Sequence, residues 1–375
     1  MNHRERYVAS LTFGNPDRVV FNPGGPREST IARWQNEGLP KNVNWMTYLL
    51  ETIGVTPDPP RKPRINLKVN FRMMPEFEEK VVEHRDGHYV VQDWKGNICE
   101  ISDKFDITYL RAAKDFVTRR WIKCPVENRA DWEKMKERYR LDTPGRLPSD
   151  FEDLCRKAKD RDWNMSIQFS GSFWQLREWC GFEGLCMMLI DEPGLVAEMA
   201  EFWKEFAASM LDRVFEHVTP DHILFDEDMA YKEKAMISPA MAREFCMPSW
   251  KRWAGQAKKA GVPVIDLDSD GYIAELIPLW IESGVNNNCP FEIAAGNDIV
   301  KYREMFGHKM AYTGAVDKRN IAKGGKVLRD EMKRLEPIVR DGGFIPSCDH
   351  GIPSDVSWPN MVEYSRLLAK LTGWL

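Results

Sequence analysis

Two pairs of chemically active side chains stand two residues apart at the ends of predicted strands. Asp268 and Asp270 flank a serine, and Cys348 and His350 flank an aspartate. In extended backbone, residues i and i+2 point to the same side, so each pair can converge on one point. Cys and His are the usual zinc ligands, and carboxylates can complete such a site. The spacing favours a metal or acid–base site. The alternative is a turn at Asp270, with Asp268 as a helix cap.

Further acidic and thiol groups follow other predicted strands. Asp226, Glu227 and Asp228 are consecutive, and mutual repulsion would raise the pKa of one of them. That suits an acid, a base or a cation site, whereas a solvated loop with a helix cap is the equally weighted alternative. Cys289 and Glu292 form a fourth cluster, in which a buried thiol is the favoured interpretation of Cys289.

Four side chains are candidates for binding a substrate: Trp174, Arg177, Tyr231 and Arg319. The guanidinium group of arginine suits bidentate contacts with a carboxylate, and an aromatic ring can line a pocket. Each arginine also fits a structural ion pair, and the aromatic residues also fit core packing.

These residues need a scaffold that brings strand ends together. From residue 163 onward, short apolar segments alternate with helical patterns, and we predict strands at 166–169, 222–225, 262–267, 285–288, 309–313 and 343–346. Such alternation predicts a parallel sheet. No GxGxxG or GxxxxGK[ST] motif follows a strand, which disfavours dinucleotide and P-loop sites. Because polar clusters follow strand after strand, we predict an α/β fold of the (β/α)8 TIM-barrel type. An open doubly wound sheet is the less favoured alternative.

The rest of the chain is predicted to decorate this barrel. Residues 1–60 are rich in Pro and Gly and predict an amino-terminal arm or cap. Residues 61–125 contain predicted strands at 64–73, 88–94 and 98–101 with turn residues between them, which indicates a small β insertion. Residues 126–375 are assigned to the barrel, and the whole chain to one domain.

The composition excludes several classes of protein. The 375 residues carry 53 Lys+Arg and 57 Asp+Glu, a net charge of −4 with no basic run, which disfavours nucleic-acid binding. No stretch approaches the ~18 consecutive apolar residues of a membrane span, and we expect no signal peptide. Eight scattered cysteines without a CxxC pair indicate reduced thiols and a cytoplasmic location. The expected partner is a small molecule or another protein, and a homodimer through outer helices is compatible with such a barrel.

Several segments together resemble the uroporphyrinogen decarboxylase superfamily: residues 226–232, 268–271, 294–298, 314–319 and 347–353, with 4–8 and 16–19 at the start. The resemblance covers most of residues 160–375 and implies a (β/α) barrel with its cleft at the carboxyl ends of the strands. The superfamily contains cofactor-free porphyrinogen decarboxylases and zinc-dependent, corrinoid-linked methyltransferases. Asp349-His350-Gly351 is similar to the Gly-His-Gly of the decarboxylases, but residues 22–27 stand where those enzymes have an Arg-rich motif.

The resemblance also implies a ligand set. Thiol-methylating members have a His-x-Cys pair where this chain has Asp268 and Asp270, and a later Cys at or near His350. Either a metal, Zn²⁺, is held by the harder ligands Asp268, Asp270 and His350, with Cys348 or Glu227 in reserve, or there is no metal. Some ether-cleaving members are similar in using carboxylate and His ligands.

Three hypotheses follow. In the first, a methyltransferase moves a methyl group from a methoxylated or other methylated small molecule to a corrinoid protein with metal assistance, using Glu227, Asp270 and His350 as catalytic residues. The chain has no Asp-x-His-x-x-Gly motif of its own, so the corrinoid would be carried by a separate partner. In the second, a metal-free decarboxylase or lyase holds a carboxylated substrate with Arg319. The third is a non-catalytic binding barrel.

Overall fold

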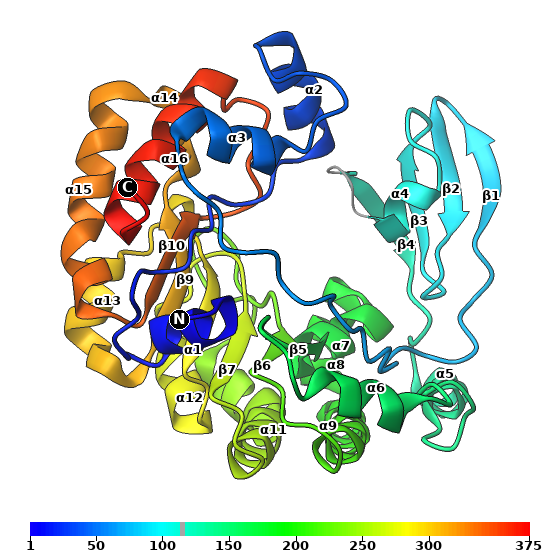
Figure 1. Ribbon diagram of the computed structural model, residues 1–375. Coiled ribbons are helices and arrows are strands. Elements are labelled where there is room, and N and C mark those ends of the chain that lie inside the picture. Colours follow the sequence, from blue (N-terminus) through cyan, green and yellow to red (C-terminus); the bar gives the residue numbers. More distant parts are fainter. Residues whose placement is uncertain (113–116) are drawn as a thin grey trace.

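A parallel sheet forms the centre of the molecule in the computed structural model, which describes residues 1–112 and 117–375 (Figure 1). The strands pair in the order β10-β9-β8-β7-β6-β5, and each pairing is parallel. They are β5 (Ser166–Ser170), β6 (His222–Asp226), β7 (Val264–Asp268), β8 (Asn287–Phe291), β9 (Ala311–Val316) and β10 (Phe344–Cys348). The alternation of strands with helices confirms the predicted α/β barrel-type fold. Six strands of the predicted (β/α)8 arrangement are hydrogen-bonded in the described ranges.

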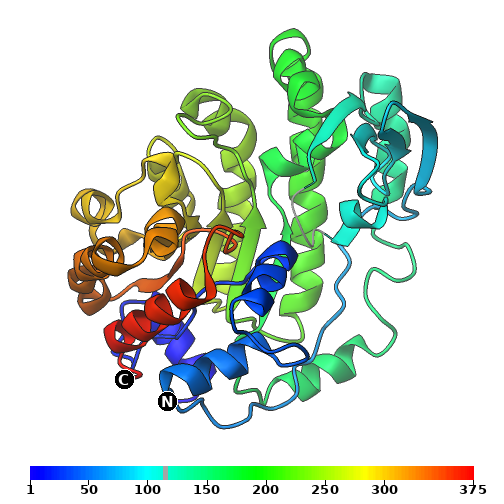
Figure 2. The same cartoon turned by 90° about the horizontal axis from the view of Figure 1, so that it is seen from above.

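Helices make the crossovers between parallel strands and cover the outer side of the sheet, as the view from above shows (Figure 2). The helices are α1 (His3–Leu11), α2 (Glu28–Asn36), α3 (Trp45–Ile53), α4 (Thr108–Ala112), α5 (Arg129–Lys136), α6 (Phe151–Ala158), α7 (Ser172–Cys180), α8 (Phe182–Asp191), α9 (Pro193–Phe215), α10 (Pro239–Met241), α11 (Met247–Lys259), α12 (Ile277–Ser283), α13 (Ile299–Phe306), α14 (Lys318–Lys323), α15 (Gly325–Asp341) and α16 (Trp358–Thr372). In the described ranges, none of them is long and apolar enough to span a membrane.

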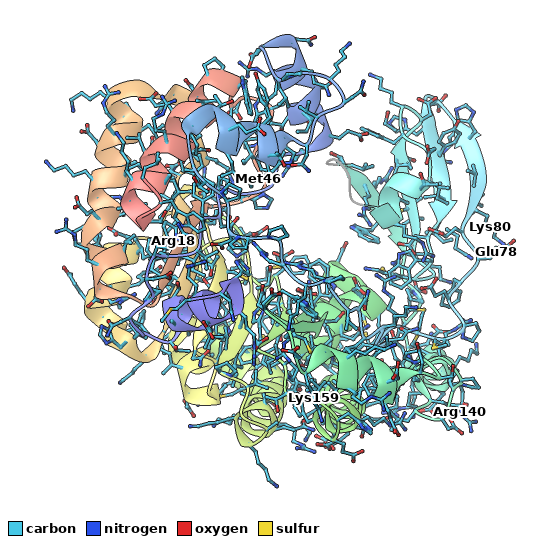
Figure 3. The ribbon with its side chains drawn as sticks, in the orientation of Figure 1. Arg18, Met46, Glu78, Lys80, Arg140 and Lys159 are labelled. Atoms are coloured by element: carbon cyan, nitrogen blue, oxygen red, sulfur yellow. The ribbon has the colours of Figure 1, made fainter. Side chains whose placement is uncertain are left out.

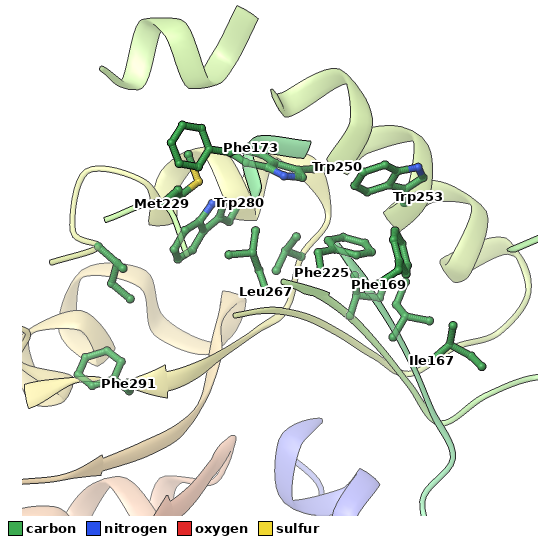
Figure 4. Packing of buried hydrophobic residues seen from close by; sticks show 14 of the residues in the cluster. Ile167, Phe169, Phe173, Phe225, Met229, Trp250, Trp253, Leu267, Trp280 and Phe291 are labelled. Atoms are coloured by element: carbon green, nitrogen blue, oxygen red, sulfur yellow. The ribbon is translucent and has the colours of Figure 1, made fainter. Parts of the chain in front are cut away.

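The outer face of the sheet carries the aromatic core (Figure 4). Phe169 on β5 and Phe225 on β6 pack against Trp253 of α11, with ring centroids 5.1 and 5.3 Å apart. Trp250 and Trp280 are also fully buried in this layer. Burial of side chains of this size dominates the stability of such a core. This explains why the tryptophan side chains pack on the outer face of the sheet.

The inner face of the same sheet is polar. Side chains alternate across a strand, so the residues between the aromatic ones point inward, and among them are Gln168, His222, Asp226 and Asp266. One end of this face is apolar: Leu11 of α1 packs there with Val20, Val264, Ala311 and Ile345. The polar half leads to the carboxyl ends of the strands.

The predicted β insertion is an antiparallel sheet of order β1-β2-β3-β4, set apart from the parallel sheet in Figure 1. Its strands are β1 (Lys80–Arg85), β2 (His88–Gln92), β3 (Ile98–Ser102) and β4 (Arg119–Lys123). Strands β2 and β3 confirm two predicted segments, whereas β1 and β4 had not been predicted. The side chains of Glu78 and Lys80 mark its outer edge (Figure 3).

The predicted strand at 64–73 is wrong. Lys68 has a positive φ of 53°, and its N–H donates to the side chain of Asn66 in a local turn. The N–H of Arg72 donates to the side chain of Asn70 in the same way. These side-chain bonds take donors that a ladder would need, so the segment runs past β5 without pairing in a sheet.

Candidate active site

A cavity of about 400 Å³ lies at the carboxyl ends of β7 to β10. It brings together Asp268, Asp270, Cys348 and His350, with Cys289 from β8 in the same wall. The amino-terminal arm closes one side through residues 22–25, where Gly24 has a φ of 96° and leaves only 3.0 Å between an added Cβ and the Cβ of Cys348. A side chain at this position would therefore push the arm away from the cavity.

Two carboxyl groups stand side by side in this region. Asp226 on β6 is the register partner of Asp268 on β7. Burial raises the pKa of Asp226 to about 6, opposed by a hydrogen bond that Gln168 Nε2 donates at 2.9 Å. Burial, followed by the charges of Asp226 and Asp270, raises the pKa of Asp268 well above its usual value. Because two adjacent half-buried carboxylates cannot both ionise cheaply, Asp268 is the member of the pair that more readily keeps a proton.

A second pair lies across the cavity. His350 Nε2 is 3.2 Å from Asp270 Oδ2, and the N–H of Gly351 donates to Nδ1 at 2.8 Å, so the imidazole is held at both nitrogens. The hydrogen bond to Asp270 raises the pKa of His350, while burial opposes this shift. Arg27 of the arm reaches the ring as well, with Nη2 3.5 Å from Nδ1.

Removal of Asp270 tests this assignment. In Asp270→Asn, the pKa of His350 is expected to fall, because its leading cause of elevation is the bond to the carboxylate. An NMR titration of the imidazole carbon resonances measures the shift. Asp330→Asn, on α15 and paired with Lys326, is the matched control and should leave His350 unchanged. An unchanged pKa in Asp270→Asn would contradict the pairing.

The predicted zinc ligands share the cavity but do not converge. Within residues 1–112 and 117–375, no three His, Cys, Asp or Glu side chains are grouped so that they could hold a metal ion. Asp268 lies beside Asp226 and Cys289, whereas Asp270 turns to His350. Burial raises the pKa of the Cys348 thiol to about 12. The donor set as it stands does not fit zinc, and the mechanism below uses no metal.

Glu227 does not face the cavity. It is fully buried, and its carboxylate accepts the backbone N–H groups of Ser172 at 2.7 Å and Phe173 at 2.8 Å, together with that of Trp174 and the indole N–H of Trp250. These backbone donors are the first turn of α7, whose N–H groups lack partners within the helix. Glu227 therefore anchors α7. Strand alternation offered the missing signal, since it places Asp226 and Glu227 on opposite faces.

The four predicted substrate-binding residues divide into two groups. Tyr231 and Arg319 line a second cavity of about 420 Å³ that meets the first one at Asp270, and Arg319 is paired there with Asp317 at 2.7 Å. Trp174 and Arg177 lie elsewhere, where the guanidinium stacks 4.2 Å from the Trp174 ring centroid. Arg177 Nη2 also bonds Asp228 at 3.1 Å. Sequence reasoning missed Gln168 and the inward polar residues before the strand ends.

The eight cysteines are all free thiols. Cys289 is the one whose sulfur approaches a carboxylate of the cavity, with Sγ 4.0 Å from Asp268 Oδ2. Burial, followed by the charges of Asp266 and Asp268, raises the pKa of its thiol well above the usual value. Cys289 therefore stays protonated and serves as a weak hydrogen-bond donor to Asp268.

Comparison with known proteins places the chain in a family. A search of curated proteins finds no match. Among solved structures, a methyltransferase from Methanosarcina mazei aligns over 100% of this chain and 98% of its own, with 14% identity and a TM-score of 0.56. A B12-independent methionine synthase from Shewanella sp. W3-18-1, solved with selenomethionine, aligns over 59% of this chain and 64% of its own, with 13% identity and a TM-score of 0.36. The model of the uroporphyrinogen decarboxylase (URO-D) family matches residues 122–368, well over half of the sequence. The chain therefore belongs to the uroporphyrinogen decarboxylase family.

Proposed function

We propose that this chain is a methyltransferase that removes a methyl group from an oxygen of a methylated small molecule and delivers it to a corrinoid on a partner protein. The observation that carries the proposal is the half-buried carboxyl pair of Asp226 and Asp268, adjoining a cavity of substrate size. Breaking a carbon–oxygen bond leaves an oxyanion, and a positioned acid stabilises it by protonation. Asp268 is that acid.

The residues of the chain divide the work. Asp268 holds a proton at the cavity wall, because burial and then the charge of Asp226 favour its protonated form. Asp270 and His350 face each other at 3.2 Å and orient the substrate through the imidazole. The arm at residues 22–25 narrows the mouth on one side. The reduced corrinoid of the partner supplies the nucleophile that accepts the methyl group.

The charge of the cavity favours methyl transfer over decarboxylation. Asp268 and Asp270 line it, and among its described lining residues there is no Lys or Arg. A substrate with several carboxylates would meet the charge of Asp270 and find no arginine or lysine in this wall. Membership of the decarboxylase family keeps the lyase as the second candidate, because a protonated carboxyl group can also protonate a carbon.

The test uses purified protein, chemically reduced cobalamin as the acceptor and a panel of methoxyarenes, methanol and methylamines as donors. The expected result is methylcobalamin, followed by its absorbance, with an oxygen-linked donor. Release of CO₂ from porphyrinogens or smaller acids without methyl transfer would establish the lyase instead. Ligand-induced stabilisation without any turnover would leave the third hypothesis, a binding barrel.

A further inference from the structure

A row of hydrogen-bonded side chains crosses the inner face of the sheet behind the cavity. Ser166 Oγ on β5 lies 3.0 Å from His222 Nδ1 on β6, and His222 Nε2 lies 3.1 Å from Asp266 Oδ2 on β7. Ser166 and His222 are register partners on neighbouring strands, and all three residues point inward. The mechanism above uses none of them.

One end of the row reaches a different opening. Ser166 is exposed and lines a cavity of about 600 Å³ between β5 and the extended segment at residues 64–71. Gln168, the hydrogen-bond donor to Asp226, lines the same cavity. This opening lies at the β5 edge of the sheet, whereas the active-site cavity lies at the carboxyl ends of β7 to β10.

The other end of the row reaches the acid. Asp266 and Asp268 are two residues apart on β7 and share its inner face. The Cys289 thiol spans them: its sulfur is 4.0 Å from Asp268 Oδ2, and Asp266 acts on it through both charge and a hydrogen bond. Ser166, His222, Asp266 and Cys289 thus form a continuous row that ends at Asp268.

Unpartnered polar atoms mark the centre of this row. Asp266 Oδ1 and both side-chain polar atoms of Asn287 are buried without a hydrogen-bond partner among the described residues. Asn287 is the register partner of Asp266 on β8, and the two residues are 0% and 2% exposed, respectively. Buried polar groups are almost always satisfied by protein or by ordered water. The two residues therefore define a place for water beside the row.

We propose that Ser166, His222, Asp266 and Cys289 form a proton relay that reprotonates Asp268 from the opening at the β5 edge. The inference rests on the proposed function, because an acceptor protein docked over the mouth would block the direct route from solvent. One proton enters at His222 Nδ1 through Ser166 while the Nε2 proton passes to Asp266. Cys289 then gives its S–H proton to the Asp268 carboxylate and takes one from Asp266. Rotation of the imidazole then turns the Nδ1–H towards Asp266. The next proton enters at Nε2 while the Nδ1 proton passes to Asp266, and a second rotation returns the ring to its first state. Each turnover therefore moves one proton to Asp268.

The surroundings of His222 do not divert the proton. The Tyr7 ring of α1 lies 5.9 Å from the imidazole, and burial raises the pKa of its hydroxyl well above the usual value. The neighbouring Asp221 is paired with Arg4 at 2.7 Å and with Arg161 at 2.9 Å, so its charge is already balanced.

The first experiment examines the resting protein and needs no substrate. In a sample with ¹⁵N-labelled histidine, assigned with a His222→Asn variant, His222 is expected to carry its proton on Nε2. Cys289→Ala should shift its ring nitrogens, whereas the matched Cys348→Ala should not, because Cys348 lines the cavity outside the row. A proton on Nδ1 of His222 would overturn the relay. So would ring ¹⁵N resonances of His222 that do not change in Cys289→Ala.

The second experiment measures turnover in the cobalamin assay. His222→Ala should lower kcat by about tenfold or more without changing KM, and added imidazole should restore the rate through the β5-side opening. Cys289→Ser should be faster than Cys289→Ala, because a hydroxyl can pass a proton. His308→Ala, on the surface beside Asp341, is the control and should behave as wild type.

Two outcomes would refute the relay: wild-type turnover in His222→Ala, or a loss that imidazole does not relieve at an unchanged melting temperature. Should His222→Ala fail to fold, Ser166→Ala replaces it; a slower kcat with a larger solvent deuterium isotope effect is then expected, and an unchanged isotope effect counts against the relay. If wild-type protein transfers no methyl group at all, the proposed function fails, and the nitrogen spectra still decide the relay.

Discussion

Asp268→Asn is expected to lower methyl transfer by about 10²- to 10⁴-fold, the usual contribution of a general acid. The amide has nearly the shape of a protonated carboxyl group, so the fold and the cavity should survive, but it has no proton to give to the leaving oxygen. The measurement is the initial rate of methylcobalamin formation, with the melting temperature as the check on folding. Asp330→Asn on α15 is the control. A variant that retains half of the wild-type rate would remove Asp268 from the mechanism.

The pH dependence follows from the same pair of carboxyl groups. The pKa of Asp226 is raised to about 6, and burial with the charge of Asp226 raises that of Asp268 well above its usual value, so the pair keeps its last proton to a higher pH than isolated carboxyl groups do. The acid form is the active one; the rate should therefore be retained at low pH and lost as the pH rises through the upper pKa of the pair. Asp226→Asn removes the repelling charge and should move this loss to lower pH. A rate that increases with pH would contradict an acid role.

The sequence pattern predicted the scaffold well for a physical reason. Apolar segments of β5 to β10 alternate with amphipathic helices, and the hydrophobic periodicity of each can be recognised in the sequence. The segment at 64–73 is wrongly predicted as a strand because its residue types suit one, while the side-chain bonds of Asn66 and Asn70 break the ladder. Such local competition depends on geometry that composition does not show.

The candidate site was predictable in location but not in its pairings. Residues at strand ends, such as Asp268 and His350, could be found because parallel strands share one rim. The pairing of Asp268 with Asp226 depends on register across two strands, and that of Asp270 with His350 on the path of two loops. The inward residues His222 and Asp266 carry no motif, because they lie inside strands where apolar residues are expected.

Glu227→Ala should be the most destabilising single substitution in the region of the site, with a loss of about 3–5 kcal/mol in the free energy of unfolding from several unsatisfied donors together. The change removes the one acceptor that satisfies the first turn of α7 and the indole N–H of Trp250. Those donors then remain buried without partners, and each carries the cost of lost solvation. Urea unfolding at neutral pH measures the loss.

Two companion variants separate the anchor from a general effect of mutation. Glu227→Gln keeps one acceptor oxygen but turns an NH₂ group towards N–H donors, so its stability should fall between wild type and Glu227→Ala. Gly171→Ala would place a methyl group into the Glu227 carboxyl and should destabilise by displacing it. Glu183→Ala, on the exposed first turn of α8, should stay within about 0.5 kcal/mol of wild type. If Glu227→Ala unfolds at the wild-type urea concentration while methyl transfer is lost, Glu227 acts in the reaction rather than as the anchor of α7. The anchor matters to the site because it fixes the end of β6, and with it the position of Asp226 beside the proposed acid.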